Sequence, residues 1–407
     1  MQMNLIIVLM IGWVVTWTLI IVLRYKQEIL SSWREPVLKH PVLIFESDDW
    51  GAGPLIQAQS LNRIKSMLNR YQDKYGHHPV MTLGVILSVP DTRKIQTEKY
   101  KVYFEKKLDH AEFLSIKNVM LKGLENGVFD LQLHGMAHYW PNNLMYALQK
   151  NDKVKDCLNA DEFLATETLP SVLQSRWTDT TTLPTMPLKE HEIQSAVREE
   201  VNVFTQIFGL TPKIVVPPTF VWTAQVESYW YEQSVEYLVT PGRRFEGRSD
   251  TGAPSGMGWK IYNSQMSDSG LRYIVRNDYF EPSLGHSADM AMSYLEKKTK
   301  LAQPTLLEIH RSNFIQGREQ TDMSLAELEK VIVNACKNYP ELMFLSTKEL
   351  ADKYVANTSN FIELSYLMKM NVVTERILAY QALKKWLYIS GLILPFFVFK
   401  KILIKLS

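Results

Sequence analysis

Two adjacent carboxylates, Asp48 and Asp49, stand at the end of an apolar run and are the first sign of chemistry in this chain. Acids at the mouth of a buried strand carry a desolvation and repulsion cost, so such a pair usually persists because a metal ion or a reacting substrate uses it. A second apolar run ends in His134-Gly135-Met136-Ala137-His138. Two histidines four residues apart can lie on one face of a helical turn and bind one cation. Together these residues predict an Asp-His-His metal site with one carboxylate to spare, as in a metal-dependent hydrolase.

A third apolar run ends in Glu308-Ile309-His310. Glu308 and His310 are two residues apart, so on a strand they face the same side. Each motif alone has an ordinary structural explanation, since Asp-Asp after a strand is commonly a helix cap or a turn, and a single histidine more often packs in the core. Acidic or imidazole groups at three strand ends are harder to explain by packing.

The elements that would position these groups are short β-branched runs alternating with helical patterns. Strands are predicted at residues 42–47, 80–88, 128–134, 213–217, 236–240, 271–276, 305–310 and 342–346, and helices at 55–74, 103–126, 190–208, 224–233, 288–301 and 324–338. Repeated strand-helix units with nearly all-apolar strands predict an α/β fold with a parallel sheet. Seven or eight units favour a (β/α)7–8 barrel-like, distorted TIM-like domain, in which sites gather at the C-terminal ends of strands.

One long region, residues 139–189, is rich in Thr, Asp and Pro and is predicted to be an irregular insertion. An ordered loop of this length is usually functional, and its position after the histidine pair makes it a candidate substrate lid. A flexible surface insertion is the equally acceptable alternative.

Composition restricts the class of protein. The 407 residues are 46% hydrophobic and 22% charged, which is typical of a globular chain, and the formal net charge of +2 gives no reason to expect a nucleic-acid partner. The two cysteines, Cys157 and Cys336, lie in no metal-type spacing, and a disulfide between them is the less favoured interpretation.

Two apolar segments predict contact with a membrane. Residues 4–23 carry no charge and are long enough to span a bilayer as an uncleaved anchor. The basic residues after it favour a cytoplasmic catalytic domain by the positive-inside rule, although a large domain can translocate despite its charges; they are Arg24, Lys26, Arg34 and Lys39. Within a C-terminal segment, residues 372–404, an apolar stretch at 386–399 has lysines on both sides. It predicts a helix or hairpin in the interface, or a second span if it extends through Ile404.

In their order along the chain these motifs resemble those of the polysaccharide deacetylase (NodB-homology) family of carbohydrate esterases. The family's first motif, T-F-D-D-G, is similar to Glu46-Ser47-Asp48-Asp49 followed by Trp50-Gly51, and its H-(S/T)-x-x-H motif is similar to His134–His138. The last family motif places a histidine at the end of a late strand, as at His310. The resemblance covers about residues 41–352, within a predicted catalytic domain at 40–355.

The resemblance implies a role for each residue and a substrate class. Asp48 would be the general base and His310 the general acid, while Asp49, His134 and His138 would hold a divalent metal, with zinc expected. The implied reaction removes an acyl group, N-acetyl above all, from a sugar of a polysaccharide or of a lipid-linked saccharide at the membrane.

This sequence also departs from the family pattern. The third family motif, R-P-P-Y/F, corresponds to Val216-Pro217-Pro218-Thr219-Phe220, which lacks the arginine that normally orients the base carboxylate. Arg243, Arg276 or Arg311 are the candidates to replace it, and Gly135 stands where the family has a hydroxyl residue. Two other functions therefore stay open: a non-catalytic glycan-binding or assembly protein on the same fold, and a barrel glycoside hydrolase that uses opposed carboxylates.

Overall fold

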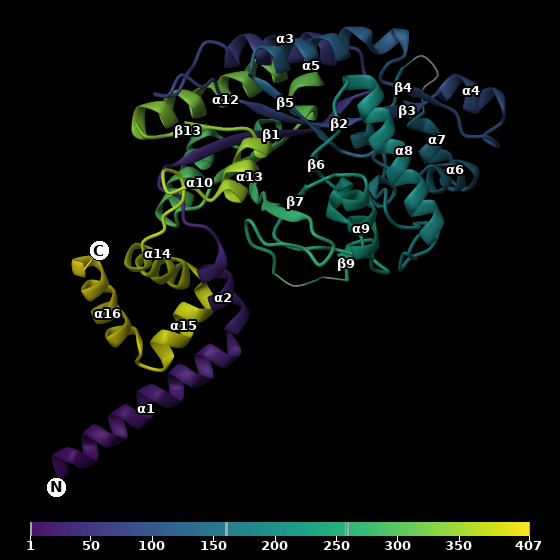
Figure 1. The fold of residues 1–407 in the computed structure, drawn as a ribbon. Helices are drawn as coiled ribbons and strands as arrows, with labels where there is room; N and C mark the ends of the chain where they lie inside the picture. The colour runs from purple at the N-terminus through teal and green to yellow at the C-terminus, as the bar shows by residue number, and fades with distance from the viewer. Residues whose placement is uncertain (1, 159–161, 257, 259, 407) are drawn as a thin grey trace.

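The structure, a computed structural model, describes residues 2–158, 162–256, 258 and 260–406 and is dominated by one parallel sheet (Figure 1). Its strands follow the order β10-β7-β6-β5-β2-β1-β12-β11, with β13 also paired to β1, and every pairing between them is parallel. The strands are β1 (Val42–Gly51), β2 (Met81–Ile86), β5 (Phe129–Leu133), β6 (Ile214–Val215), β7 (Tyr237–Thr240), β10 (Arg272–Val275), β11 (Asp278–Tyr279), β12 (Thr305–His310) and β13 (Met343–Phe344). Most of their residues are buried, as expected of parallel strands covered on both faces.

The sheet curls into an almost closed barrel. β10 and β11 lie at opposite ends of the strand order, yet only Arg276 and Asn277 separate them in the sequence. The covalent chain therefore brings the two edges of the sheet together at this point, where no ladder of hydrogen bonds joins them in the described residues. The predicted α/β barrel-like fold is confirmed, and Arg276 lies at its seam.

Helices pack around the outside of the sheet. In Figure 1, α3, α5 and α12 cover one side, and α8 and α9 lie on another. The outer helices are α3 (Gln57–Leu68), α5 (Leu114–Glu125), α8 (Glu190–Phe208), α9 (Ala224–Glu232), α10 (Ala288–Lys300), α12 (Arg318–Asn338) and α13 (Thr347–Ala356). α8 illustrates why they form, because Ile193, Val197 and Phe204 recur at helical spacing, are buried, and turn one face to the core. Gly209, at φ 73°, ends that helix in the left-handed conformation that glycine favours.

Two predictions about secondary structure were wrong in part. The helix predicted at 103–126 begins only at Leu114, because Glu105–Lys107 (β4) pairs instead with Ser88–Pro90 (β3) as a short antiparallel ladder. The insertion at 139–189 is not irregular throughout, because it contains α6 (Pro141–Lys150) and α7 (Asp152–Asp156). Buried Leu144, Leu148 and Val154 of these helices form a small separate core. Residues 159–161 of the insertion lie outside the described residues.

Short elements complete the loops at the barrel mouth and edges. They are α4 (Thr92–Thr97), α11 (Ser312–Ile315), the strands β8 (Gly247–Arg248) and β9 (Pro254–Ser255), and the 3-10 turns η1 (Ala111–Phe113), η2 (Thr166–Thr168), η3 (Ser171–Gln174), η4 (Pro218–Phe220) and η5 (Pro282–Leu284).

A separate group of helices stands apart from the barrel at the lower left of Figure 1. It consists of α1 (Gln2–Arg24), α2 (Lys26–Arg34), α14 (Tyr366–Ala379), α15 (Gln381–Ile389) and α16 (Ile393–Leu406). Among the described helices, α1 is long and apolar enough to cross a membrane, and α15 and α16 qualify only when counted together as one segment bent by 115°. The predicted apolar stretch 386–399 is thus two helices with a sharp bend between them.

Arg376 of α14 joins this group to the barrel. Its buried guanidinium donates five hydrogen bonds to backbone carbonyls, at distances of 2.9–3.1 Å, and the acceptors are Ser32, Glu35, Pro36, Leu301 and Ala302. The first three carbonyls follow or end α2, and the last two follow α10. One side chain therefore links the group of apolar helices to the barrel.

Replacing Arg376 with Met is expected to lower the free energy of unfolding by about 3 kcal/mol, because several buried carbonyls lose a charged donor at once. The midpoint of thermal unfolding of the full chain in detergent would measure this loss. Arg318→Met is the matched control, since the Arg318 side chain is 91% exposed and should change little. Equal midpoints for the two variants would contradict the role assigned to Arg376.

Candidate metal centre

Asp48 and Asp49 lie within β1 and not at its end, which corrects the prediction from sequence. The pairing of β1 with β2 shifts register between Ser47 and Trp50, and Asp49 has φ 73°. Adjacent side chains of a regular strand point to opposite faces, whereas a β-bulge redirects them. The bulge lets both carboxylates line the same cavity at the barrel mouth.

His134 and His138 do not lie on a helical turn either. They flank a bent loop after β5, in which Gly135 has φ 90°. A Cβ at Gly135 would come within 3.0 Å of Arg176 Cδ, so a larger residue would be crowded as well as strained. The loop brings the two rings to 5.0 Å between centroids. The glycine that departs from the family motif is thus explained by the local backbone.

Glu200 of α8 binds the backbone of this loop. The buried Glu200 carboxylate accepts a hydrogen bond from the Met136 backbone N–H at 3.1 Å and pairs with Arg176 Nε at 3.1 Å. Burial raises the pKa of Glu200, while Arg176 opposes that effect. Nothing in the sequence pattern of α8 marks this residue, which supports the loop between the two histidines.

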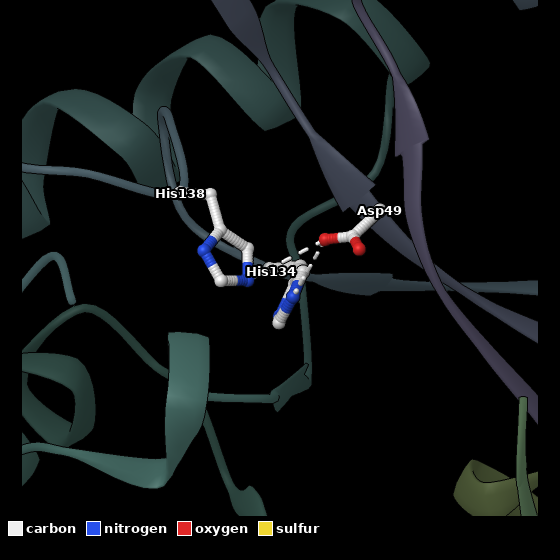
Figure 2. A group of neighbouring side chains, drawn as sticks. All are labelled: Asp49, His134 and His138. Carbon is white, nitrogen blue, oxygen red and sulfur yellow. Dashed lines mark ion pairs between the residues drawn. The ribbon is translucent and has the colours of Figure 1, made fainter. Parts of the chain in front are cut away.

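The three predicted ligands meet in Figure 2. The nearest nitrogens of His134 and His138 each lie 3.4 Å from Asp49 Oδ1, and candidate ligand atoms of all three residues fall within 4.8 Å of one another. His134 Nδ1 lies 2.8 Å from the Val216 carbonyl, which can only accept, so this nitrogen donates and Nε2 keeps its lone pair. Asp49 Oδ1 has no hydrogen-bond partner among the described residues. When His134 is neutral, the lone pair of Nε2 and the carboxylate oxygen of Asp49 face each other in a buried site, and a cation bound between them would satisfy both.

The electrostatics of the centre are compatible with a bound cation. Burial lowers the pKa of His134, but the charges of Asp48 and Asp49 outweigh it and leave the pKa raised. The field at this point therefore favours a positive charge. Burial lowers the pKa of His138 to about 4, which keeps its imidazole neutral as a metal ligand must be. Asp49 has its pKa lowered by both histidines despite burial, so it is ionised. The residues fit a divalent cation such as zinc.

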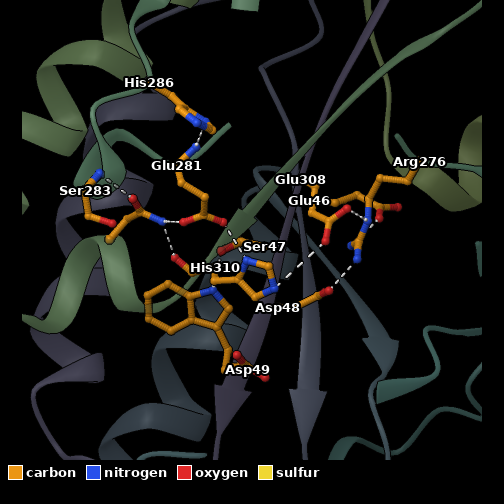
Figure 3. Close-up of polar contacts among 12 residues, drawn as sticks. Glu46, Ser47, Asp48, Asp49, Arg276, Glu281, Ser283, His286, Glu308 and His310 are labelled. Carbon is orange, nitrogen blue, oxygen red and sulfur yellow. Dashed lines mark hydrogen bonds and ion pairs between the residues drawn. The ribbon is translucent and has the colours of Figure 1, made fainter. Parts of the chain in front are cut away.

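Arg276, at the seam of the barrel, binds the carboxylates beside the metal ligands (Figure 3). It donates to Asp48 Oδ2 at 2.6 Å and to Glu46 Oε2 at 2.7 Å, and its Nε lies 3.4 Å from Glu308. Burial raises the pKa of Asp48, but Arg276 outweighs it and holds the pKa below its usual range. Among the three arginines suggested by the sequence, Arg276 is thus the one that orients Asp48. Arg311 pairs instead with Glu167 at 2.7 Å.

His310 ends β12 and faces the same cavity. Its Nδ1 lies 2.5 Å from Glu281 Oε1, and its Nε2 lies 4.0 Å from Glu308 (Figure 3). Asn313 also donates to the Glu281 carboxylate, which fixes it in place. Burial lowers the pKa of His310, but the hydrogen bond with Glu281 and the surrounding carboxylates raise it to about 10. His310 is therefore an imidazolium at neutral pH, held in one orientation.

The five predicted site residues line one cavity of about 540 Å³. The insertion contributes Glu167, Thr168 and Gln174 to the wall, and η4 adds Thr219 and Phe220. Thr219 and Phe220 both have φ 54°, and Phe220 lies 5.3 Å from the Arg276 guanidinium. Strain in non-glycine residues concentrates at functional sites, and it coincides here with the cavity. Whether the insertion moves as a lid stays a prediction.

Sequence reasoning missed two residues of this site. Glu281 follows the two-residue strand β11, which carries no recognisable pattern, so no signal pointed to it as the partner of His310. Glu46 gave a usable signal, because it lies two residues before Asp48 in an apolar strand and must face the same side.

Comparison with known families gives one match. Residues 96–357, more than half of the chain, match the model of glycosyl hydrolase family 57. The chain belongs to glycosyl hydrolase family 57. The protein is accordingly a carbohydrate-active enzyme of a hydrolase or transferase family. The family 57 match includes His134, His138 and His310 and begins after Asp48 and Asp49. The predicted resemblance to polysaccharide deacetylases is supported only in part, because the family model that matches is one of glycosyl hydrolases.

Other comparisons add the following. No curated protein matches this family 57 chain. Among solved structures, it is similar to 4-α-glucanotransferase from Thermococcus litoralis, with TM-score 0.41, 8% identity, and coverage of 80% of this chain and 41% of that one. It is also similar to the peptidoglycan deacetylase PdaC from Bacillus subtilis (TM-score 0.36, 10% identity, 78% and 93% coverage). A family 4 acetyl xylan esterase from Clostridium thermocellum, in complex with a cobalt ion, gives TM-score 0.37, 10% identity, and 76% and 89% coverage.

Proposed function

We propose that this protein is a metal-dependent carbohydrate deacylase that removes an acyl group, N-acetyl above all, from a sugar. The observation that carries the proposal is the buried group of Asp49, His134 and His138, whose ligand atoms lie within 4.8 Å of one another beside a cavity. Three protein ligands leave a fourth position open, which is the arrangement of catalytic zinc sites. When bound there, a divalent cation would polarise an acyl carbonyl and acidify a water molecule.

The residues around the ligands supply the proton transfers. Asp48 is ionised and oriented through one oxygen by Arg276, and its other oxygen, Oδ1, has no partner among the described residues. That oxygen is available to accept a proton from the attacking water. His310, protonated and held by Glu281, is placed to donate a proton to the departing amine or alcohol. The pair holds opposite protonation states, which a hydrolytic cycle needs.

Metal analysis combined with an acyl-release assay tests this function. The full chain is purified in detergent without added metal, and bound divalent metal is measured by elemental analysis. Acetate release is then measured from an N-acetylated oligosaccharide, before and after chelation and zinc reconstitution. About one ion per chain, with acetate release that depends on it, is the expected result. A chain that binds no metal after reconstitution would contradict the proposal and favour a non-catalytic glycan-binding or assembly protein.

Replacing Glu281 with Gln is expected to lower the pKa of His310, because the imidazolium loses its charged hydrogen-bond partner. His310 must be protonated to act as the acid, so the alkaline limb of the pH profile of kcat/KM should move to lower pH, and activity near pH 8 should fall about tenfold or more. The raised pKa of His310 also contributes to the stability of the native protein. Because that pKa rises from 6.5 to about 10 on folding, the contribution is fully present below pH 6.5 and is lost as pH rises through 10. Glu319→Gln, on the surface of α12, is the control. Identical profiles for both variants would contradict the role of Glu281 as the partner that keeps His310 protonated.

A glycoside hydrolase is the second candidate, favoured by the family 57 match. Glycosidic bonds are cleaved by paired carboxylates without a metal, and Asp48, Glu281 and Glu308 all line the cavity. Against it, Asp48 and Glu308 both contact Arg276, which ties them together on one wall of the cavity. New reducing ends formed from an oligosaccharide after chelation would indicate a glycosidase, whereas the deacylase would stop.

A membrane anchor at α1 would restrict the class of substrate. With α1 as an anchor and a cytoplasmic domain, we expect a lipid-linked saccharide; with the domain outside, an envelope or exported polysaccharide is expected. Release of acetate from lipid-linked but not from free oligosaccharide would support the first alternative.

A further inference from the structure

The bent pair α15–α16 lies directly against α1. The Trp17 and Trp386 rings are 5.9 Å apart, and Trp13 Nε1 donates to the Ser390 carbonyl at 3.0 Å. From the first contact to the second, the position moves back by four residues in α1 and forward by four residues from Trp386 to Ser390, which is about one helical turn in each case. α1 and α15 therefore run antiparallel, with Ser390, at the bend, level with Trp13.

This register gives the depth that the bend would reach in a bilayer. Arg24 ends α1 on the side of the catalytic domain, and Trp13 lies eleven residues before it. At about 1.5 Å of rise per residue the separation is about 16 Å, which is half of the roughly 30 Å hydrocarbon core. If α1 crosses the bilayer, the bend between α15 and α16 lies near the middle of it.

The side chains of the pair divide as this position requires. Leu383, Leu387, Leu392 and Ile393 are buried and pack with Ile21 and Tyr25 of the first helices. The opposite surface exposes large apolar side chains over both helices and the bend, among them Tyr388, Ile389, Leu394, Val398, Phe399 and Ile402. Leu394 is 72% exposed. An apolar surface of this extent is typical of contact with lipid or another protein, and its continuity with α1 favours lipid.

Charged side chains indicate that α15 and α16, the two arms of the bent pair, both extend from the bend towards the barrel domain. Lys384 and Lys385 lie near the middle of α15, and Lys400 and Lys401 lie in the second half of α16, so each pair lies on the domain side of the bend. Lys400 pairs with Glu375 of α14 at 2.5 Å, and α14 is fixed to the barrel through Arg376. An arm tied to α14 cannot also emerge from the far side of the membrane.

We propose that α15 and α16 form a re-entrant hairpin that enters the leaflet facing the catalytic domain, turns near the middle of the bilayer against α1, and returns to the same side. Its exposed apolar surface contacts the acyl chains of the lipid, and the four lysines extend their ammonium groups from the two arms towards the headgroups. The proposal does not depend on the reaction of the catalytic site. It gives the protein a second membrane contact that limits rotation of the domain about α1.

Single cysteines in the full chain test this topology. Cys157 and Cys336 are first replaced with serine, and one cysteine is then introduced by Ser359→Cys on the domain surface, Lys401→Cys on α16, or Leu394→Cys beside the bend. All three positions are exposed, so the substitutions remove little packing. Each variant is reconstituted into phosphatidylcholine–phosphatidylglycerol vesicles and treated from one side with a membrane-impermeant maleimide.

The expected result is labelling of the Ser359→Cys and Lys401→Cys variants from the same side and loss of labelling for Leu394→Cys. A fluorophore attached at position 394 should be quenched more by lipid nitroxides deep in the acyl chain than by those near the headgroup. Labelling of Lys401→Cys only from the opposite side would overturn the proposal in favour of a bent span. Labelling of Leu394→Cys as strong as that of Ser359→Cys would show that the pair lies outside the bilayer.

Discussion

Replacing Asp49 is expected to remove the bound divalent metal and to abolish deacylation, the largest functional effect that we predict. Asp49 contributes the oxygen that faces both histidines, so its loss leaves two neutral ligands and an open site. Asp49→Asn is the sharper variant, because asparagine tolerates φ 73° whereas alanine adds backbone strain. Metal content by elemental analysis, together with acetate release, measures the outcome.

Asp48→Asn is the matched control for this prediction. Asp48 is adjacent but is held by Arg276 and not by the histidines, so this variant should keep its metal and lose about 10²–10⁴-fold in kcat. His77→Ala, at an exposed histidine, should leave both quantities unchanged. An Asp49→Asn protein that retains one metal ion per chain would refute the Asp-His-His assignment even if its activity were low.

Replacing Arg276 with Met is expected to have the largest effect on stability, about 3–5 kcal/mol in the free energy of unfolding. The variant leaves Glu46, Asp48 and Glu308 without their shared cation in a buried site, and it also releases the junction between β10 and β11. Chemical or thermal unfolding of the full chain in detergent measures the loss. Arg318→Met serves again as the exposed control, with little expected change.

The pH dependence of that loss separates electrostatics from packing. In the native protein Asp48 has a lowered pKa, because Arg276 outweighs the effect of burial, so its contribution to stability is present at neutral pH and disappears as pH falls through that pKa. Without Arg276 the effect of burial is less opposed, and the pKa of the carboxyls rises. The difference between variant and native protein should therefore shrink towards acid pH as they protonate. A difference that is constant with pH would mean that only packing was lost.

Part of the candidate site could be predicted because its residues occur in local sequence patterns that can be recognised. Asp48 and Asp49 interrupt an apolar strand, His134 and His138 have ligand spacing, and His310 ends a late strand. These signals are local since strand alternation and burial cost act on neighbours in the sequence. The rest of the site is non-local. Arg276 lies 228 residues from Asp48, and Glu281 lies 29 residues from His310 in a segment without regular structure.

The sequence by itself determined the alternation of strands and helices, the order of the chemical groups and the two apolar segments, because periodicity and residue type suffice for each. Tertiary structure decided the rest. The bulge in β1 turns two adjacent carboxylates to one side, and the bent loop at Gly135 sets the distance between the two histidines. The seam of the barrel brings Arg276 to Asp48, and the bend after α15 turns one apolar stretch into two helices against α1. Each depends on contacts between residues far apart in the chain, whose free energy exists only once the chain has folded.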